Sequence, residues 1–209
     1  LEDRILAQLS RVALTRLQSG HVGAGDGAAV AQGLEWMAAL PISIADQAGQ
    51  TVAEIRTTCR RLHTESPVRL IVVDYIQLIP RSKRARTRTE ELDEAATELK
   101  GLAKTLGASV LLLSQLKRTE GRPRLDDLRD CGALEQVADC VWLLHRKDHR
   151  ASGSTECILA KQRNGPTGTC YLTLDRDTTT FTDGGAPEPE PEPVESLRRR
   201  STYRSRYQE

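Results

Sequence analysis

The stretch VRLIVVD, residues 68–74, decides the fold. It is a nearly unbroken run of branched apolar residues, which is typical of a strand in a parallel sheet that is covered on both faces. A helical pattern follows, with apolar residues recurring every three or four positions from Leu92 to Leu106. Ser109–Leu113 is then a second buried strand. The alternation of strand and helix predicts an α/β fold with a mainly parallel sheet flanked by helices.

The chain before this stretch is predicted to be mainly helical. Apolar residues repeat at helical spacing over Arg4–Leu17. The glycine-rich stretch Gly20–Gly27 ends that helix. Asp26 is placed to cap a second helix, which Pro41 stops. Ile42–Ala45 is a short strand candidate.

Two capping boxes mark the starts of later helices. Thr51 and Glu54 lie three residues apart ahead of one apolar pattern. Thr87 and Glu90 have the same spacing ahead of the pattern that begins at Leu92. In such a box each side chain satisfies a backbone donor near the other residue, which sets where the helix begins.

Three more strand candidates lie in the C-terminal third of the chain, at Cys140–Leu144, Glu156–Ala160 and Thr169–Leu174. No helical pattern separates them. A parallel connection needs a long crossover, whereas antiparallel strands can be joined by a short turn. We therefore expect these strands to add an antiparallel part.

The composition excludes several classes of protein. Thirty Lys and Arg against 29 Asp and Glu leave a net charge of +1, so any contact with nucleic acid must come from local loops. No apolar run approaches the length of a membrane span, and the N-terminus lacks the pattern of a secretory signal. Five cysteines without a CxxC pair favour reduced thiols in a cytosol. We expect a cytoplasmic protein with no membrane partner.

The composition changes after residue 183. Residues 184–209 begin Gly-Gly-Ala, continue with alternating Pro and Glu, and end rich in Arg and Ser. A segment this poor in apolar residues does not bury enough surface to order itself. We predict one folded domain over residues 1–183 and a disordered tail over residues 184–209.

Polar residues follow each of the two buried strands. Asp74 ends the first strand, and Ser114 and Gln115 end the second. Ligands of open α/β sheets bind at the carboxyl ends of strands. An Asp there suits Mg²⁺ shared with phosphate oxygens, and a Gln can orient a water or sense a terminal phosphate. For Asp74, the alternative is a residue that caps the next loop or helix, and the strand alone favours neither interpretation. For Gln115, the alternative is an ordinary polar loop residue, which is the commoner case.

Two later stretches carry cations. In KQRNGP, residues 161–166, Lys161 and Arg163 lie two positions apart before a turn, so both are placed to contact phosphate. The alternative is an ordinary charged hairpin tip. In DLRDCGALEQVAD, residues 127–139, Arg129 lies close to Gly132, which lets the backbone approach a phosphodiester. The alternative is an ordinary helix start.

Together these stretches resemble one family, the bacterial and phage replicative DNA helicases of the DnaB type, which have a RecA-like motor core. The resemblance extends over residues 4–181. It is carried by LIVVDYIQL (70–78), LLLSQL (111–116), DLRDCGALEQVAD (127–139) and KQRNGPTGT (161–169), in the family's order. Two further stretches, LAQLSRV and TVAEIRTTCRRL, match more loosely.

The resemblance implies a RecA-like P-loop ATPase core that uses ATP and Mg²⁺. Asp74 then resembles the Walker B aspartate that positions Mg²⁺. Gln115 resembles the sensor glutamine that links nucleotide state to the DNA-binding loops. Lys161 and Arg163 resemble paired cations that reach the ATP of the neighbouring subunit. These four residues are the catalytic and cofactor-binding residues that the resemblance implies.

The resemblance also implies DNA binding and assembly. Arg129, Asp130 and Gly132 resemble the loop that grips single-stranded DNA. Members of the family form homo-hexameric rings, translocate 5′–3′ on single-stranded DNA during replication, and interact with primase and a helicase loader.

The chain departs from the family pattern in several ways. A P-loop of the form GxxxxGK[ST] is absent, and Gly20–Gly27 does not replace it, because it lacks a Lys and follows a helix. The family has a catalytic glutamate in a strand-end segment similar to SLEM. Glu2 resembles it superficially but lies too close to the LAQLSRV helix, so this role is not assigned to it. The family's Arg-Glu-Ser-Gly appears here as RDCG, residues 129–132. The N-terminal primase-binding domain of the family is also missing.

We therefore expect residues 1–183 to be a partial RecA-like motor domain, incomplete at its N-terminus, that does not hydrolyse ATP alone. A first residue other than Met favours a fragment, while a truncated gene model, a split gene and a decayed copy stay open. Two functions are carried forward. One is an ATP-dependent 5′–3′ DNA helicase, complete or complemented. The other is a catalytically inactive DNA-binding or ring-interaction module.

Overall fold

The computed structural model describes residues 1–80, 87–117, 121–128, 132–146 and 154–185. The helices are α1 (Glu2–Ser10), α2 (Leu14–Ser19), α3 (Gly27–Ala39), α4 (Val52–Glu65), α5 (Arg88–Leu106) and α6 (Gly132–Val137). The strands are β1 (Leu70–Val73), β2 (Ser109–Leu112), β3 (Cys140–His145), β4 (Ser154–Gln162), β5 (Gly168–Asp175) and β6 (Thr180–Asp183). Two single turns of 3₁₀ helix, η1 (Ile76–Leu78) and η2 (Leu125–Asp127), follow β1 and precede α6.

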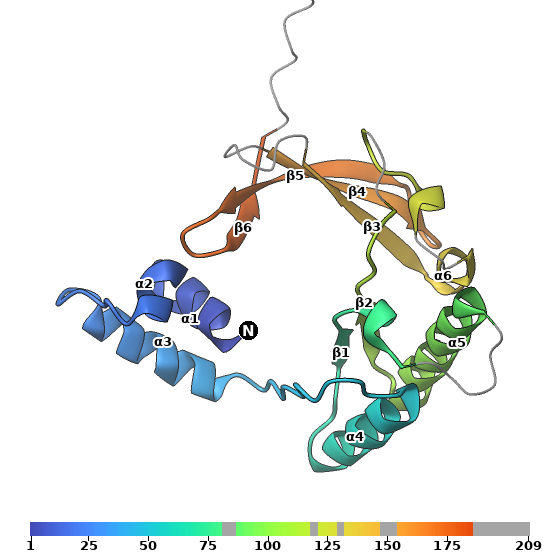
Figure 1. The fold of residues 1–209 in the computed structure, drawn as a ribbon, viewed down its shortest axis with the longest axis horizontal. Coiled ribbons are helices and arrows are strands. Elements are labelled where there is room, and N and C mark those ends of the chain that lie inside the picture. The colour runs from blue at the N-terminus through green and yellow to red at the C-terminus, as the bar shows by residue number, and fades with distance from the viewer. Residues whose placement is uncertain (81–86, 118–120, 129–131, 147–153, 186–209) are drawn as a thin grey trace, which may run out of the picture.

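The described strands form two sheets. β1 and β2 pair in parallel, with Ile71 opposite Val110. β3, β4, β5 and β6 form an antiparallel sheet in chain order, which arches away from the parallel pair (Figure 1). The α/β fold and the antiparallel addition are confirmed. The expected parallel sheet comprises only two strands in the described residues, so the antiparallel sheet is the larger one there.

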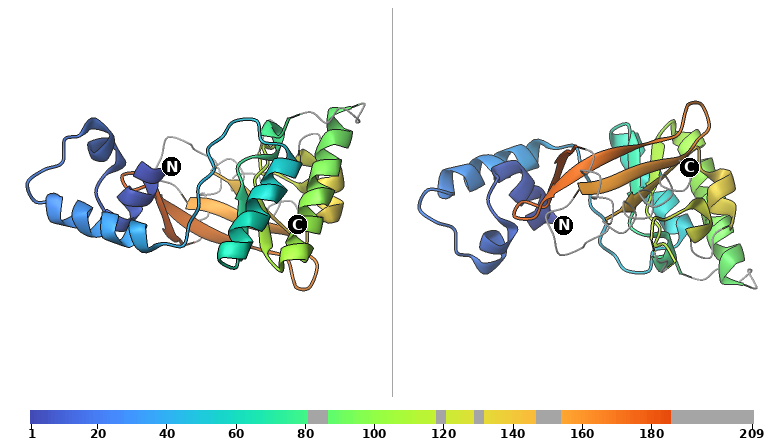
Figure 2. Two further views of the ribbon diagram at one scale, coloured as in Figure 1. Left: turned by 90° about the horizontal axis from the view of Figure 1, so that it is seen from below. Right: turned by 90° about the horizontal axis from the view of Figure 1, so that it is seen from above.

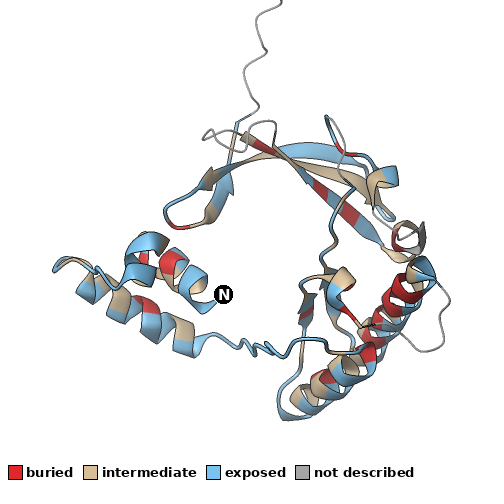
Figure 3. Ribbon diagram, in the orientation of Figure 1, coloured by how far each residue is buried: buried red, intermediate tan, exposed pale blue. Residues whose placement is uncertain are grey.

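The main core lies between α4, α5 and the two parallel strands. α5 begins at the predicted capping box, where the amide of Glu90 donates to Thr87 Oγ1 at 3.2 Å, and Gly107 ends it in the left-handed conformation. The buried positions of α5 recur along one side of the helix (Figure 3). The buried cluster comprises Val52, Cys59, Ile71, Ile76, Ile79, Leu92, Ala95, Ala96, Leu99, Leu102 and Leu134.

The parallel pair is covered on one face only in the described structure. Ile71 points into the core and is 7% exposed, whereas Leu70 is 55% exposed. Val72, Leu111 and Leu113 are exposed as well. The prediction that both faces are covered is therefore wrong for the described residues. The apolar run indicated a strand, but burial depends on which elements pack against each face.

The N-terminal helical segment is broken, whereas the sequence predicted one helix over Arg4–Leu17. Arg11 adopts a left-handed conformation with φ of 58°, which separates α1 from α2. Ser10 Oγ donates to the Leu6 carbonyl at 2.7 Å and accepts from the Val12 amide at 3.3 Å. A serine that bonds to nearby backbone competes with helix propagation in this way.

α3 begins after Asp26 and ends before Pro41, as predicted. The Asp26 side chain does not cap α3, however. It accepts from the Gly23 amide at 3.2 Å and forms an ion pair with Arg16. Ile42–Ala45 is not a strand, because it is exposed and pairs with no strand among the described residues.

The N-terminal helices contact the turn between β5 and β6. The Leu14 amide donates to the Asp177 carbonyl at 2.7 Å, and Gln8 Nε2 donates to the Thr179 carbonyl at 3.1 Å. The antiparallel sheet consequently extends from these helices to α6 at its other end (Figure 2). Within the described ranges, none of the helices has the length and apolar character needed to cross a bilayer.

Candidate nucleotide and DNA site

The carboxyl ends of β1 and β2 bring two predicted site residues to one edge. Val73 lies opposite Leu112, and the Leu113 amide donates to the Val73 carbonyl at 3.0 Å. Asp74 and Gln115 follow these positions, and both are exposed. β1 and β2 are neighbours in the sheet, which is the condition for both side chains to serve one ligand.

Gln77 ties the two strand ends together. Its Nε2 donates to Ser114 Oγ at 2.9 Å, and its Oε1 accepts from the Gln115 amide at 3.3 Å. The Ile76 amide, one residue earlier, donates to the Leu113 carbonyl at 3.0 Å. The backbone at Gln115 is thus held by the turn that follows Asp74.

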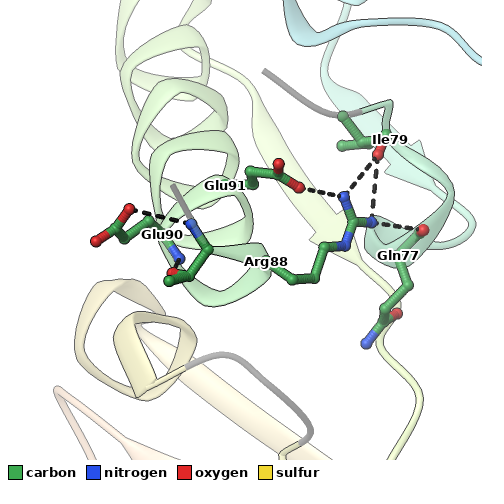
Figure 4. A network of polar contacts seen from close by, with 6 residues as sticks. Gln77, Ile79, Arg88, Glu90 and Glu91 are labelled. Atoms are coloured by element: carbon green, nitrogen blue, oxygen red, sulfur yellow. Dashed lines mark hydrogen bonds and ion pairs between the residues drawn. The ribbon is translucent and has the colours of Figure 1, made fainter. Parts of the chain in front are cut away.

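Arg88, at the start of α5, also binds this turn through hydrogen bonds to its backbone carbonyls (Figure 4). Its Nη2 donates to the Gln77 carbonyl at 2.7 Å, and both terminal nitrogens donate to the Ile79 carbonyl at 3.2 and 3.3 Å. Nη1 also donates to the buried carboxylate of Glu91 at 2.8 Å. Since Glu91 neutralises this half-buried cation, the network connects α5 to the strand ends without an unpaired charge.

The cation pair, Lys161 and Arg163, lies at the far end of β4. Lys161 Nζ donates to the Glu135 carbonyl, and Arg163 Nη2 donates to the Gln136 carbonyl at 3.1 Å. Both side chains therefore bind backbone carbonyls in the last turn of α6. A cation is favourable there because the unpaired carbonyls carry the negative end of the helix dipole. Arg163 remains 52% exposed.

Asp139 links the cation pair to α5. Arg163 Nη1 lies 3.4 Å from Asp139 Oδ1, and the Arg163 amide donates to the Asp139 carbonyl at 2.9 Å. Lys100 of α5 pairs with the other carboxylate oxygen. The hydrogen bond from Lys100, aided by the charges of Arg163 and Lys161, lowers the pKa of the Asp139 carboxyl from its ordinary value. Asp139 therefore stays ionised at neutral pH.

Part of the predicted DNA loop lies outside the described residues, namely Arg129 and Asp130. Gly132 is described as the first residue of α6. The segment before the loop is anchored, because Leu128 pairs with Leu116 in an antiparallel bridge and the Lys117 amide donates to the Asp127 carbonyl at 2.8 Å.

The predicted residues therefore form two groups. Asp74 and Gln115 lie at the edge of the parallel pair, whereas Lys161 and Arg163 lie beside α6. No hydrogen bond or ion pair within the described part of the chain joins the first group to the second. One chain thus presents a carboxylate and an amide at the ends of β1 and β2, and two cations beside α6.

Sequence reasoning missed the residues that hold these groups in place. Gln77 lies inside the LIVVDYIQL stretch, and Asp139 ends the DLRDCGALEQVAD stretch, so both were visible as polar residues in informative motifs. Lys100 and Arg88 lie in helical or basic stretches that carry several similar charges. Nothing in the local pattern distinguishes them, because their partners are brought close only by the tertiary fold.

The residues present fit parts of a Mg²⁺–nucleotide site. An exposed carboxylate at a strand end suits a cation that keeps most of its waters and shares phosphate oxygens. A complete protein cage for a metal is not present in the described ranges, where three or more His, Cys, Asp or Glu side chains nowhere gather. The phosphate cradle has no counterpart in the sequence, which lacks the P-loop pattern.

The chain matches the family model described as DnaB-like helicase C terminal domain over residues 1–183. It is 37% identical over 190 residues to the replicative DNA helicase DnaB of Mycobacterium leprae, covering 86% of this chain and 32% of that protein. It is 35% identical over 189 residues to the replicative DNA helicase DnaC of Bacillus subtilis, covering 85% and 42%. The chain thus spans about a third to two fifths of these relatives.

Solved structures match the fold. A DnaB-like replicative helicase, studied with its interactions with primase, has a TM-score of 0.81 and 27% identity, covering 88% of this chain and 48% of that one. A second solved structure, described as an ATPase domain, has a TM-score of 0.80 and 28% identity, covering 87% and 69%. The RecA-like character expected of the fold is therefore confirmed.

Proposed function

Since the chain belongs to the DnaB-like helicase C-terminal domain family, we propose that it is motor-domain sequence of a replicative, ATP-dependent DNA helicase. The observation that carries the proposal is the junction of the strand ends, where Gln77 holds Gln115 beside the strand that ends in Asp74. This arrangement supports a role for Gln115 in sensing nucleotide beside a role for Asp74 in holding Mg²⁺.

Asp74 is proposed to hold Mg²⁺ through water, together with the β- and γ-phosphates of ATP. Mg²⁺ would neutralise charge on the transferring phosphoryl group. Gln115 is proposed to orient the attacking water or to report the state of the terminal phosphate. Its backbone is restrained by Gln77 while its side chain is exposed, which supports a role at the surface of a ligand.

Lys161 and Arg163 are proposed to act on the ATP of a neighbouring subunit in a homo-hexamer. Their side chains bind carbonyls of α6 and, among the described residues, form no hydrogen bond or ion pair with Asp74 or Gln115, which supports a site shared between two chains. An arginine that stabilises charge in the transition state of phosphoryl transfer contributes on the order of a thousandfold or more to the rate. Asp139 keeps Arg163 partnered until such a phosphate is present.

Arg129, Asp130 and Gly132 are proposed to bind single-stranded DNA, with translocation 5′–3′ and unwinding as the result. Primase and a helicase loader are the proposed protein partners, and the cytoplasm is the proposed compartment. The near-neutral charge of the chain supports local loop contacts over a broad basic surface.

The 209-residue chain is proposed to hydrolyse no ATP by itself. Phosphate binding needs the backbone amides and Lys of a P-loop, and the sequence holds no such pattern. DNA-stimulated ATP turnover by the purified chain would contradict this part of the proposal.

A chimera tests the motor function. Residues 1–183 replace the matching part of the Bacillus subtilis relative, which keeps its own remaining segments. We expect hexameric rings with DNA-stimulated ATP hydrolysis. Arg163→Ala should abolish turnover and spare nucleotide binding, and Asp74→Ala should abolish Mg²⁺-dependent turnover.

Rings that contain two kinds of mutant subunit test whether Arg163 acts on the ATP of a neighbouring subunit or within its own subunit. Asp74→Ala and Arg163→Ala subunits damage different sides of a shared site, so mixing them should recover part of the activity. No recovery at any ratio would show that Arg163 acts in its own subunit or only in folding. Rings that form and bind DNA but never hydrolyse ATP would favour the inactive DNA-binding or ring-interaction module.

A further inference from the structure

Arg122 joins the segment that precedes the predicted DNA loop to the antiparallel sheet through its side chain. Its Nε donates to Glu156 Oε2 at 2.7 Å, and its Nη2 donates to Thr169 Oγ1 at 2.7 Å. Glu156 lies on β4 and Thr169 on the neighbouring β5, so one guanidinium spans two strands. The Glu156 side chain is only 19% exposed, whereas that of Arg122 is 54% exposed.

The backbone around Arg122 supports the same anchor. Gly121 has a φ of 96°, which favours glycine and turns the chain just before Arg122. Pro123, immediately after it, is buried. A rigid, buried residue next to Arg122 in the chain limits the backbone positions open to Arg122, which lowers the entropy cost of forming the ion pair.

Two backbone contacts join residues on either side of Arg122. The Lys117 amide donates to the Asp127 carbonyl at 2.8 Å, and Leu128 bridges to Leu116. β4, which carries Glu156, continues to Lys161 near its end. Leu128 is followed directly in the sequence by Arg129.

We infer that Arg122 and Glu156 are positioning residues, which fix residues 121–128 to the β4–β5 sheet and thereby set where the DNA-binding loop begins. The inference rests on the proposed function for the role of that loop. Because its guanidinium already donates to Glu156 and Thr169, Arg122 does not itself bind phosphate. It acts on DNA affinity by fixing the start of the loop before DNA arrives.

The first test uses the 209-residue chain and amide hydrogen exchange, which needs no DNA. Arg122→Ala and Glu156→Gln should each speed exchange at the Lys117 and Leu128 amides about two- to fivefold, the change expected for an exposed ion pair. The matched control is Arg61→Ala, which breaks the exposed Arg61–Glu65 pair on α4 and should leave both amides unchanged. The charge-swapped variant Arg122→Glu with Glu156→Arg should restore slow exchange.

The second test measures binding of a fluorescent single-stranded oligonucleotide by anisotropy over a range of salt concentrations. Arg122→Ala and Glu156→Gln should each weaken binding about two- to fivefold and leave the salt dependence unchanged. Adding Glu156→Gln to Arg122→Ala should cause no further loss, because the contact is already broken. Arg129→Ala should weaken binding and also reduce the salt dependence, which tests the proposed DNA loop separately.

Several results would overturn the inference. Unchanged exchange in Arg122→Ala would show that the contact does not hold the segment. A salt slope lowered by about 0.7 in Arg122→Ala, with tighter binding by Glu156→Gln, would make Arg122 a phosphate ligand that Glu156 restrains. No DNA binding by the wild-type chain would remove the positioning role along with the proposed DNA loop, while exchange would still decide whether the anchor exists.

Discussion

The side chain of Gln77 is hydrogen-bonded to the backbone of Gln115, with 3.3 Å between Gln77 Oε1 and the Gln115 amide nitrogen. Gln77 lies in the turn after β1, and Gln115 follows β2. The two strand ends are therefore joined by a side chain in addition to the strand pairing. The turn that follows Asp74 is thus bonded directly to the backbone of Gln115.

Gln77→Leu should destabilise the protein by about 1–2 kcal/mol, because the substitution nearly keeps the volume but leaves the Ser114 hydroxyl and the Gln115 amide without this partner. Gln77 is half-buried, so water replaces the lost partner only in part. Urea unfolding measures the loss. Gln47→Leu is the control, because Gln47 is exposed and bonds to Gln50. Equal, small effects at both positions would contradict the role of Gln77.

Ile71→Ala and Leu70→Ala remove side chains of equal size from opposite faces of β1. Ile71→Ala should cost about 2–5 kcal/mol, because it opens a cavity in the core. Leu70→Ala should change stability by no more than about 0.5 kcal/mol, because that side chain is mostly exposed. Urea unfolding of both variants checks this. Similar losses would show that the second face is covered in solution, for example by self-association.

Asp139→Asn should lower stability at pH 7, and its effect should shrink as the pH falls below the unfolded pKa of Asp139. The hydrogen bond from Lys100 lowers the pKa of Asp139, so the stabilisation is present above the unfolded value of about 3.9 and is lost as pH falls through the lower folded value. Unfolding midpoints of the variant and the wild type over a series of pH values from 7 downward measure the difference. In Lys100→Met, NMR titration should find the pKa of Asp139 raised toward its ordinary value. A destabilisation by Asp139→Asn that grows as pH falls would contradict this ion pair.

Gly33→Val should destabilise the packing of α1 against α3 by about 1–3 kcal/mol, because the added side chain overpacks the contact. A Cβ at Gly33 would lie 3.0 Å from Ser10 Cβ and 3.1 Å from Leu6 Cδ1, so the helices must separate. Gly101→Val is the matched control, because a Cβ at this α5 position meets no atom within 4 Å and valine is the better helix former. Thermal unfolding compares the two. A neutral Gly33→Val would show that α1 and α3 adjust freely.

The local sequence pattern was sufficient to predict those elements whose ends are set by hydrogen bonds among their own residues. The capping boxes at Thr51 and Thr87 were predicted and are present, because the bonds that form them lie within one turn of helix. The paired strands β1 and β2 were likewise predictable from unbroken apolar runs. The order of motifs also identified the family, since it depends on sequence alone.

The break at Arg11 was not predicted, because the helical spacing of apolar residues does not show that Ser10 bonds to the nearby backbone. The absence of a strand at Ile42–Ala45 was not predictable, because a strand needs a partner that only the tertiary fold supplies. The exposed face of β1 is the clearest example. An apolar residue such as Leu70 has the same sequence signal whether or not another element covers it.

For the candidate site, the sequence alone indicated the candidate residues, namely Asp74, Gln115, Lys161 and Arg163. Only the tertiary structure decided how they are grouped and restrained. Gln77 joins the strand ends, and the cation pair binds the last turn of α6 beside Asp139 and Lys100. The physical reason is distance along the chain. A hydrogen bond between residues 38 positions apart leaves no periodic signal, so it exists only once the fold has brought its partners together.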